Sequence, residues 1–374
     1  MTSQPNLMQP FRIAVPDSDL AHLRSRLRDT RWPTAALADR WEQGTPLDYL
    51  QSVVGYWAEE YDWRRAEARL NSYEQFTTEV DGQRIHFLHV RSPHADALPL
   101  VLSHGWPGSV VEFLDCIDPL VGPPDGRDAF HLVIPSLPGY GFSGPTSDLG
   151  WNPRRMGAAF ATVMERLGYG RYGVQGGDWG SAVSANMADL FPERVVGLHM
   201  NYLTVPPPKG VTPPEHAPAE RFAATGSGYQ QIQATKPQTI GYGLDDSPAG
   251  LAGWIIEKFR EWSACDGDPE QSFTKDQMLT NVMVYWVTRT ATSSARLYWE
   301  MRQAGRSAIP HRPVTVPTGV ANFPAEIGRS ERAWAEHRYN IVHWTHPARG
   351  GHFAAMEVPD LFVEDVRAFF RSIR

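Results

Sequence analysis

The feature that most constrains the fold is a five-residue motif near the middle of the chain, Gly-Gly-Asp-Trp-Gly at residues 176–180. It follows a short apolar run at 172–175 and precedes a helix-compatible stretch at 181–190. Glycines around a central residue permit the strained strand-to-helix turn called a nucleophile elbow, which projects that residue over a sheet. The projecting residue here is Asp178. Taken alone, Gly-Gly-Asp favours an aspartate that caps a helix over a nucleophile. The choice between these two interpretations therefore depends on the other motifs.

The surrounding pattern alternates short apolar runs with helical stretches, which is typical of buried parallel strands. We expect strands at 98–103, 130–134, 172–175, 195–200, 314–320 and 341–344, and helices at 155–167 and 359–374. A proline-rich stretch from 206 to 218 interrupts the alternation, and residues 277–303 beyond it have a mostly helical pattern. The sequence therefore predicts a mostly parallel central sheet flanked by helices and interrupted by an inserted helical lid.

The N-terminal part precedes the first strands and is mainly helical. A capped amphipathic helix is expected from residue 16, ending at Trp32-Pro33, and a second helical stretch at 47–69. Residues 76–80 and 84–90 then form a β-hairpin around Asp81-Gly82. We thus divide the chain into four segments: an N-terminal helical extension (1–75), a first core part (76–203), the lid (204–311) and a second core part (312–374).

Three further motifs favour a catalytic role for Asp178. His-Gly-Trp-Pro-Gly at 104–108 ends the expected strand at 98–103, where such a loop supplies an oxyanion-hole N–H opposite an elbow. The pair Gly350-Gly351 follows the expected strand at 341–344 and directly precedes His352. Glu326 follows the expected strand at 314–320. The order Asp178, Glu326, His352 is the nucleophile, acid, histidine order of α/β-hydrolases, so we predict the α/β-hydrolase fold.

Composition limits the partners of the protein. The 374 residues carry a formal charge of −7 without a basic run, so nucleic acid is not an expected partner. Two distant cysteines give neither a disulfide framework nor a metal knuckle and fit a reducing compartment. The N-terminus lacks an apolar leader, and no stretch reaches the roughly 18 apolar residues of a membrane span, so we expect a cytoplasmic protein without a membrane anchor.

No cofactor and no metal are expected. The chain has no phosphate-binding glycine loop with the required strand and acidic partner, and its histidines are scattered. The oligomeric state stays open between a monomer and a homodimer.

Taken together, these motifs resemble the epoxide hydrolases of the α/β-hydrolase fold, specifically the microsomal and juvenile-hormone branch and its soluble bacterial relatives. The resemblance spans nearly the whole chain. It is carried by Arg31-Trp32-Pro33, HGWPGS at 104–109, GGDWGS at 176–181, Tyr285-Trp286, SSARLYWE at 293–300, VPTG at 316–319, FPAE at 323–326 and GGHFAAMEVP at 350–359. The chain departs from the microsomal members in lacking their hydrophobic N-terminal anchor.

The resemblance implies a role for each candidate residue. Asp178 would be the nucleophile, His352 the base and Glu326 its orienting acid. The lid tyrosines that hold the epoxide oxygen would be Tyr229 and Tyr298. The backbone N–H groups of Trp106 and Trp179 would form the oxyanion hole, and these two tryptophans and two tyrosines would also contact the substrate.

These residue types suit the opening of an epoxide by water. A serine nucleophile would become an ether, which water does not readily cleave, whereas a carboxylate forms an ester. A histidine can activate water to attack that ester, and neutral phenols can stabilise the basic alkoxide that leaves in the first step. The expected partners are thus a small-molecule epoxide and water, and the 13 tryptophans favour an apolar, aromatic or bulky epoxide.

Two other functions fit parts of the pattern. A haloalkane dehalogenase also uses an aspartate in an elbow, and Trp106 and Trp179 could then hold a halide with their indoles. A binding protein could keep the fold and lose the chemistry. The N-terminal segment and the motif around Tyr298 favour the epoxide branch over the first, and the complete set of candidate residues argues against the second.

Overall fold

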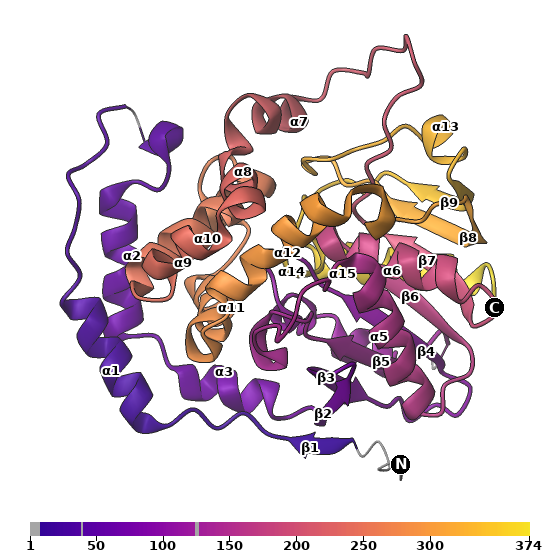
Figure 1. Cartoon of the computed structure of the whole chain (residues 1–374), viewed down its shortest axis with the longest axis horizontal. Helices are drawn as coiled ribbons and strands as arrows, with labels where there is room; N and C mark the ends of the chain where they lie inside the picture. Colours follow the sequence, from indigo (N-terminus) through magenta and orange to yellow (C-terminus); the bar gives the residue numbers. More distant parts are fainter. Residues whose placement is uncertain (1–7, 39, 124–126) are drawn as a thin grey trace.

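The structure is a computed structural model that describes residues 8–38, 40–123 and 127–374. These residues contain a nine-stranded sheet with the order β1-β2-β3-β5-β4-β6-β7-β8-β9 (Figure 1). The strands are β1 (Gln9–Phe11), β2 (Gln75–Val80), β3 (Gln83–Val90), β4 (Leu98–Ser103), β5 (Phe130–Pro135), β6 (Tyr172–Gly176), β7 (Val195–Met200), β8 (Val314–Ala321) and β9 (Tyr339–Thr345). Every strand expected from the sequence is confirmed.

The sheet is antiparallel at one edge and parallel elsewhere. β1, β2, β3 and β5 pair antiparallel in that order, whereas β4 to β9 are all joined by parallel pairings. The predicted hairpin of β2 and β3 turns at Asp81 and Gly82, which both have positive φ, 51° and 74°. An Asp-Gly pair tolerates this left-handed backbone and fixes the hairpin register.

Helices cover both faces of the sheet (Figure 1). On one face α5 (Pro153–Arg166) packs on α6 (Asp178–Leu190), which in turn packs on the central strands β6 and β7. On the other face α15 (Pro359–Arg371) packs against β7, β8 and the short helix α4 (Ile117–Val121). The central strands are buried on both sides, as their continuous apolar runs predicted.

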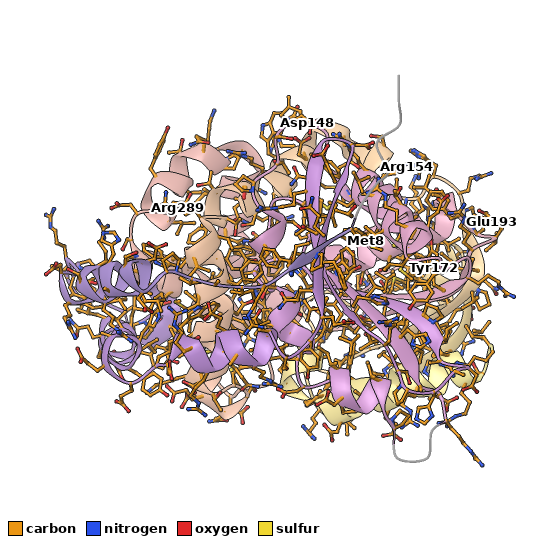
Figure 2. All side chains as sticks on the ribbon, turned by 90° about the horizontal axis from the view of Figure 1, so that it is seen from below. Met8, Asp148, Arg154, Tyr172, Glu193 and Arg289 are labelled. Atoms are coloured by element: carbon orange, nitrogen blue, oxygen red, sulfur yellow. The ribbon has the colours of Figure 1, made fainter. Side chains whose placement is uncertain are left out.

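A set of helices is inserted between β7 and β8 and lies beside the sheet (Figure 1). Residues 203–216, which include five prolines, connect it to β7 without regular structure. The inserted helices are α7 (Ala217–Arg221), α8 (Gly228–Thr235), α9 (Pro237–Leu244), α10 (Pro248–Trp262), α11 (Lys275–Thr288) and α12 (Ala291–Ala304). Side chains fill the space between the layers, with Tyr172 of β6 toward one end of the molecule and Arg289 after α11 toward the other (Figure 2).

The N-terminal helices join the sheet edge to the inserted helices (Figure 1). They are α1 (Asp17–Arg28), α2 (Leu47–Glu59) and α3 (Trp63–Leu70), and both α1 and α2 pack on α10. Tyr56 donates to Asp276 at 2.7 Å, the Tyr61 hydroxyl lies 3.0 Å from that of Thr280, and Thr45 donates to the Gly253 carbonyl at 3.0 Å. Three polar contacts therefore bind this segment to α10 and α11.

Three N-terminal details differ from the prediction. α1 starts without a side-chain cap and ends at Arg28, before the expected Trp32-Pro33. The helical stretch expected at 47–69 is two helices, α2 and α3. Asp62 is the N-cap of α3, and its side chain accepts a hydrogen bond from the Arg64 N–H at 2.9 Å. The short strand β1 was missed. Among the described residues, no helix combines the length and apolarity that crossing a membrane requires.

Candidate active site

Asp178 is the first residue of α6, and only Gly177 separates it from the end of β6. Its φ is +46°, a left-handed conformation that is rare for a residue with a side chain. The N-cap of α6 is Gly177, so Asp178 does not cap the helix. A Cβ on residue 180 would lie 1.9 Å from the Ser103 carbonyl oxygen, so only glycine lets the turn pack against the end of β4. The local structure is thus the strand-to-helix elbow, with its side chain held in a strained turn.

The loop after β4 brings a backbone donor to the Asp178 carboxylate. The N–H of Trp106 donates to Asp178 Oδ1 at 2.8 Å. Residue 105 must be glycine for this approach, because a Cβ there would lie 2.2 Å from the same oxygen. The loop is anchored by buried His104, whose Nε2 accepts from the Leu137 N–H at 3.2 Å and whose Nδ1 lies 3.0 Å from the Gly105 carbonyl. Burial lowers the pKa of His104 to about 4, so the anchor stays neutral.

The second expected donor, Trp179, directly follows Asp178 in α6. The Trp179 N–H makes no hydrogen bond to the Asp178 carboxylate in the structure. Among the described residues, Trp106 is the only one whose backbone N–H donates to that carboxylate. The Trp179 ring instead packs at 90° on the Tyr298 ring, with 4.9 Å between centroids.

His352 lies between two carboxylates. Its Nε2 is 3.3 Å from Asp178 Oδ2, and its Nδ1 is 2.8 and 3.0 Å from the two oxygens of Glu326. The exposed fractions of His352 and Glu326 are 4% and 1%. Burial alone would lower the pKa of His352, but the Glu326 and Asp178 charges outweigh it and raise that pKa well above its usual range. The resting site therefore favours an imidazolium between two anions.

The loop that carries His352 is tied to the end of α10. The His352 N–H donates to the Trp262 carbonyl oxygen at 2.9 Å. Glu357 accepts from the Phe353 N–H with one oxygen and from the Ala264 N–H with the other, both at 3.0 Å. Burial raises the pKa of Glu357 to about 7, although both hydrogen bonds oppose the shift. The sequence analysis missed Glu357, and its only signal was its place in GGHFAAMEVP.

The two tyrosines come from the inserted helices, and their rings contact each other and the tryptophans on either side of Asp178 in the site. Tyr229 belongs to α8 and Tyr298 to α12, and their buried rings are 5.7 Å apart at 81°. The Tyr229 ring stacks on the Trp106 indole at 4.9 Å and 9°. Burial, followed by the Asp178 charge, raises the pKa of Tyr229, and burial and the neighbouring Tyr229 raise that of Tyr298. Both phenols remain protonated donors at neutral pH.

Trp262 is a second residue that the sequence analysis missed. Its ring centroid lies 5.0 Å from that of His352, 5.3 Å from Tyr229 and 6.1 Å from Trp106. Trp262 thus forms an apolar contact with both His352 and Tyr229. No motif marks this tryptophan, because only the packing of α10 decides which residue of the helix faces the site.

Glu112 is a further carboxyl beside the site that the prediction did not include. Its Oε1 lies 1.4 Å from the position that a Cβ on Gly108 would take, so the carboxyl packs directly on the 104–108 loop. Burial raises its pKa to about 8, and the Asp178 charge adds to the shift. Among the residues that the structure describes, no group of three or more histidine, cysteine, aspartate or glutamate side chains could hold a metal ion.

The chain is similar to known proteins in both sequence and structure. Residues 8–113 match the family model described as the epoxide hydrolase N terminus, and residues 99–216 match the alpha/beta hydrolase fold. The chain is 48% identical to a protein of Stigmatella aurantiaca that is provisionally named an epoxide hydrolase, over 98% of this chain and 85% of that one. It is 36% identical to epoxide hydrolase 1 of Sus scrofa, over 97% of this chain and 88% of the other. The chain belongs to the epoxide hydrolase family.

Solved structures of this family have the same fold. The juvenile hormone epoxide hydrolase of the silkworm Bombyx mori superposes with a TM-score of 0.92 at 34% identity, covering 99% of this chain and 96% of that one. The Aspergillus niger epoxide hydrolase gives 0.89 at 32% identity, covering 98% and 97%. The predicted family and the predicted α/β-hydrolase fold are therefore both confirmed.

Proposed function

We propose that this protein hydrolyses an apolar epoxide to a vicinal diol through an alkyl ester on Asp178. The observation that carries the proposal is the pair of buried, protonated tyrosines packed on Trp106, whose N–H donates to the Asp178 carboxylate, and on Trp179, which follows Asp178 in α6. Family membership and the contacts of His352 with Asp178 and Glu326 support the same reaction.

In the first step Asp178 Oδ2 attacks a ring carbon of the epoxide. Trp106 holds Oδ1 of the same carboxylate, so Oδ2 is the oxygen left for attack. The carbon–oxygen bond of the ring breaks, and its electron pair passes to the epoxide oxygen. The hydroxyls of Tyr229 and Tyr298 donate to that oxygen. Both phenols are neutral, and both belong to the inserted helices that face Asp178.

In the second step His352 activates water. Ester formation removes the Asp178 charge, which is one of the causes that raise the pKa of His352, so the imidazolium loses its proton more readily. Neutral Nε2 then takes a proton from water, which attacks the Asp178 carbonyl carbon. Glu326 stabilises the imidazolium that reforms, and the oxyanion develops on Oδ1.

We assign the oxyanion hole to the N–H groups of Trp106 and Trp179, and each donor is worth about 3 kcal/mol at the tetrahedral stage. The intermediate collapses as His352 returns its proton to the departing diol oxygen. The Asp178 carboxylic acid formed in this step then gives its proton to Nε2, which restores the carboxylate and the imidazolium of the resting site. In this scheme residues 204–311 act as the lid, and the rings of Trp106, Trp179, Tyr229 and Tyr298 contact an apolar substrate.

The test is a single turnover of excess enzyme with an aryl epoxide in ¹⁸O-water, followed by mass spectrometry of the diol and of the peptide with Asp178. The proposal expects an unlabelled diol and one ¹⁸O atom in Asp178, because water attacks the ester carbonyl. A labelled diol with an unlabelled peptide would mean direct attack by water. Halide release from chloroalkanes or bromoalkanes, without diol formation from epoxides, would instead indicate a dehalogenase.

A further inference from the structure

Lys258 is a buried cation that the proposed mechanism leaves without a role. It belongs to α10 and is 5% exposed. Its Nζ pairs with the neighbouring Glu257 carboxylate and lies 4.7 Å from the ring centroid of Tyr229. The Trp254 and Trp262 rings lie farther from Nζ, at 5.8 and 6.0 Å. The Glu257 carboxylate compensates the buried charge, which would otherwise cost stability, but it does not explain why the ammonium lies against the ring of Tyr229.

The ring of Tyr229 contacts both an indole and an ammonium. Trp106 stacks on one face of the ring at 4.9 Å and 9°, so that face is filled. The Lys258 ammonium lies over the same ring, 4.7 Å from its centroid. These two contacts connect Trp106, whose N–H donates to Asp178, through the ring of Tyr229 to Lys258 in α10. A cation over an aromatic face is attracted to the ring, and the attraction grows when the ring gains negative charge.

We propose that Lys258 is a positioning residue for epoxide opening, acting through Tyr229: it fixes the ring and stabilises the negative charge that the phenol gains. The inference rests on the proposed function. Asp178 Oδ2 bonds to the epoxide carbon, the ring carbon–oxygen bond breaks, and the epoxide oxygen takes the phenolic proton of Tyr229. The phenolate lies under the ammonium until it is reprotonated through water.

The proton balance closes within the site. The resting state holds an Asp178 carboxylate, a His352 imidazolium and a neutral Tyr229. After alkylation, His352 must lose one proton to become the base of the second step, and the Tyr229 phenolate must gain one. Net transfer of that proton leaves an ester, a neutral imidazole, a neutral phenol and a hydroxyalkyl group, with no co-reactant required.

The experiment measures alkylation and ester hydrolysis separately, by rapid-quench mass spectrometry in single turnovers of an aryl epoxide. Four proteins form a cycle: wild type, Lys258→Met, Tyr229→Phe and the double variant. We expect Lys258→Met to slow alkylation about tenfold, with ester hydrolysis unchanged. In the Tyr229→Phe background, where no phenolate can form, the same change should have no further effect. Lys258→Arg should retain most of the alkylation rate.

Two controls separate this role from a structural one. Lys258→Met leaves Glu257 without its partner, so Glu257→Gln/Lys258→Met is compared with Glu257→Gln and should show the same slower alkylation. Lys236→Met, an exposed lysine after α8, should behave as wild type. Equal slowing in the Tyr229→Phe background, equal slowing of both steps, or unchanged alkylation would each overturn the inference. Absence of any Asp178 adduct in wild type would instead refute the proposed function.

Discussion

The backbone N–H of His352 donates to the carbonyl oxygen of Trp262, the last residue of α10, at 2.9 Å. A Cβ on Gly351 would lie 2.6 Å from the same oxygen, so the loop and the helix end are in close contact. The position of the imidazole relative to Asp178 therefore depends on an inserted helix as well as on the sheet.

Glu357→Gln should slow ester hydrolysis about tenfold and leave alkylation nearly unchanged. The carboxylate accepts two backbone N–H groups, whereas a glutamine amide turns its NH₂ toward one of them, so the His352 loop loosens. The ester on Asp178 should accumulate during turnover, as measured by intact-protein mass spectrometry. Glu364→Gln, at an exposed position of α15, is the matched control. Equal loss in both half-reactions would contradict the interpretation.

His352→Gln should form the Asp178 adduct and fail to hydrolyse it. In the proposed mechanism Asp178 and the tyrosines carry out alkylation, whereas the base is required for attack by water. One equivalent of epoxide should remain attached, on the peptide with Asp178. Sustained diol formation by this variant would remove His352 from the role of base.

Asp178→Asn should lower the pKa of His352, because it removes one of the two negative charges that raise it. In wild type the folded pKa lies above the unfolded value of about 6.5, so the stabilisation is complete below that pH and is lost as pH rises through the folded pKa. The variant should lose part of this dependence. An NMR titration of the imidazole and unfolding curves at several pH values test both expectations, and an unchanged pKa would contradict them.

Gly105→Ala should abolish most activity while the protein stays folded. The new Cβ would lie 2.2 Å from Asp178 Oδ1, so the carboxylate must leave the Trp106 N–H. Losing such a donor costs about a hundredfold in turnover. Gly55→Ala in α2, where a Cβ meets nothing within 4 Å, is the control and should be neutral or slightly stabilising. Diol formation at the wild-type rate by Gly105→Ala would show that this hydrogen bond is dispensable.

Tyr298→Phe should slow alkylation by about a hundredfold and affect ester hydrolysis much less, since in the proposed mechanism the phenol donates to the epoxide oxygen. The Phe ring keeps the packing on Trp179, so folding is preserved. Stopped-flow tryptophan fluorescence follows the alkylation step. The reverse pattern, slow hydrolysis with fast alkylation, would reject the assignment.

The sequence predicted the structure best where a backbone conformation or a buried position accepts only certain residue types. The glycines around Asp178 and the apolar runs of β4 to β9 predicted the elbow and the sheet, because close backbone contact and two-sided burial each demand particular residues. β1 was missed because three residues containing Pro10 carry no alternating pattern, and only pairing with β2 defines them. Lys258 and Trp262 were missed for another reason: within α10, tertiary packing alone decides which side chains face Tyr229 and His352.

The N-terminal segment has a consequence for engineering. Its strand β1 extends the sheet, while α1 and α2 pack on α10, the helix that carries Lys258 and Trp262. A chimaera that takes only residues 204–311 from a relative would thus set Thr45, Tyr56 and Tyr61 of this chain against helices of another sequence. The exchangeable module is discontinuous and comprises the N-terminal segment together with the insertion. Substrate range should move between relatives as that pair of segments.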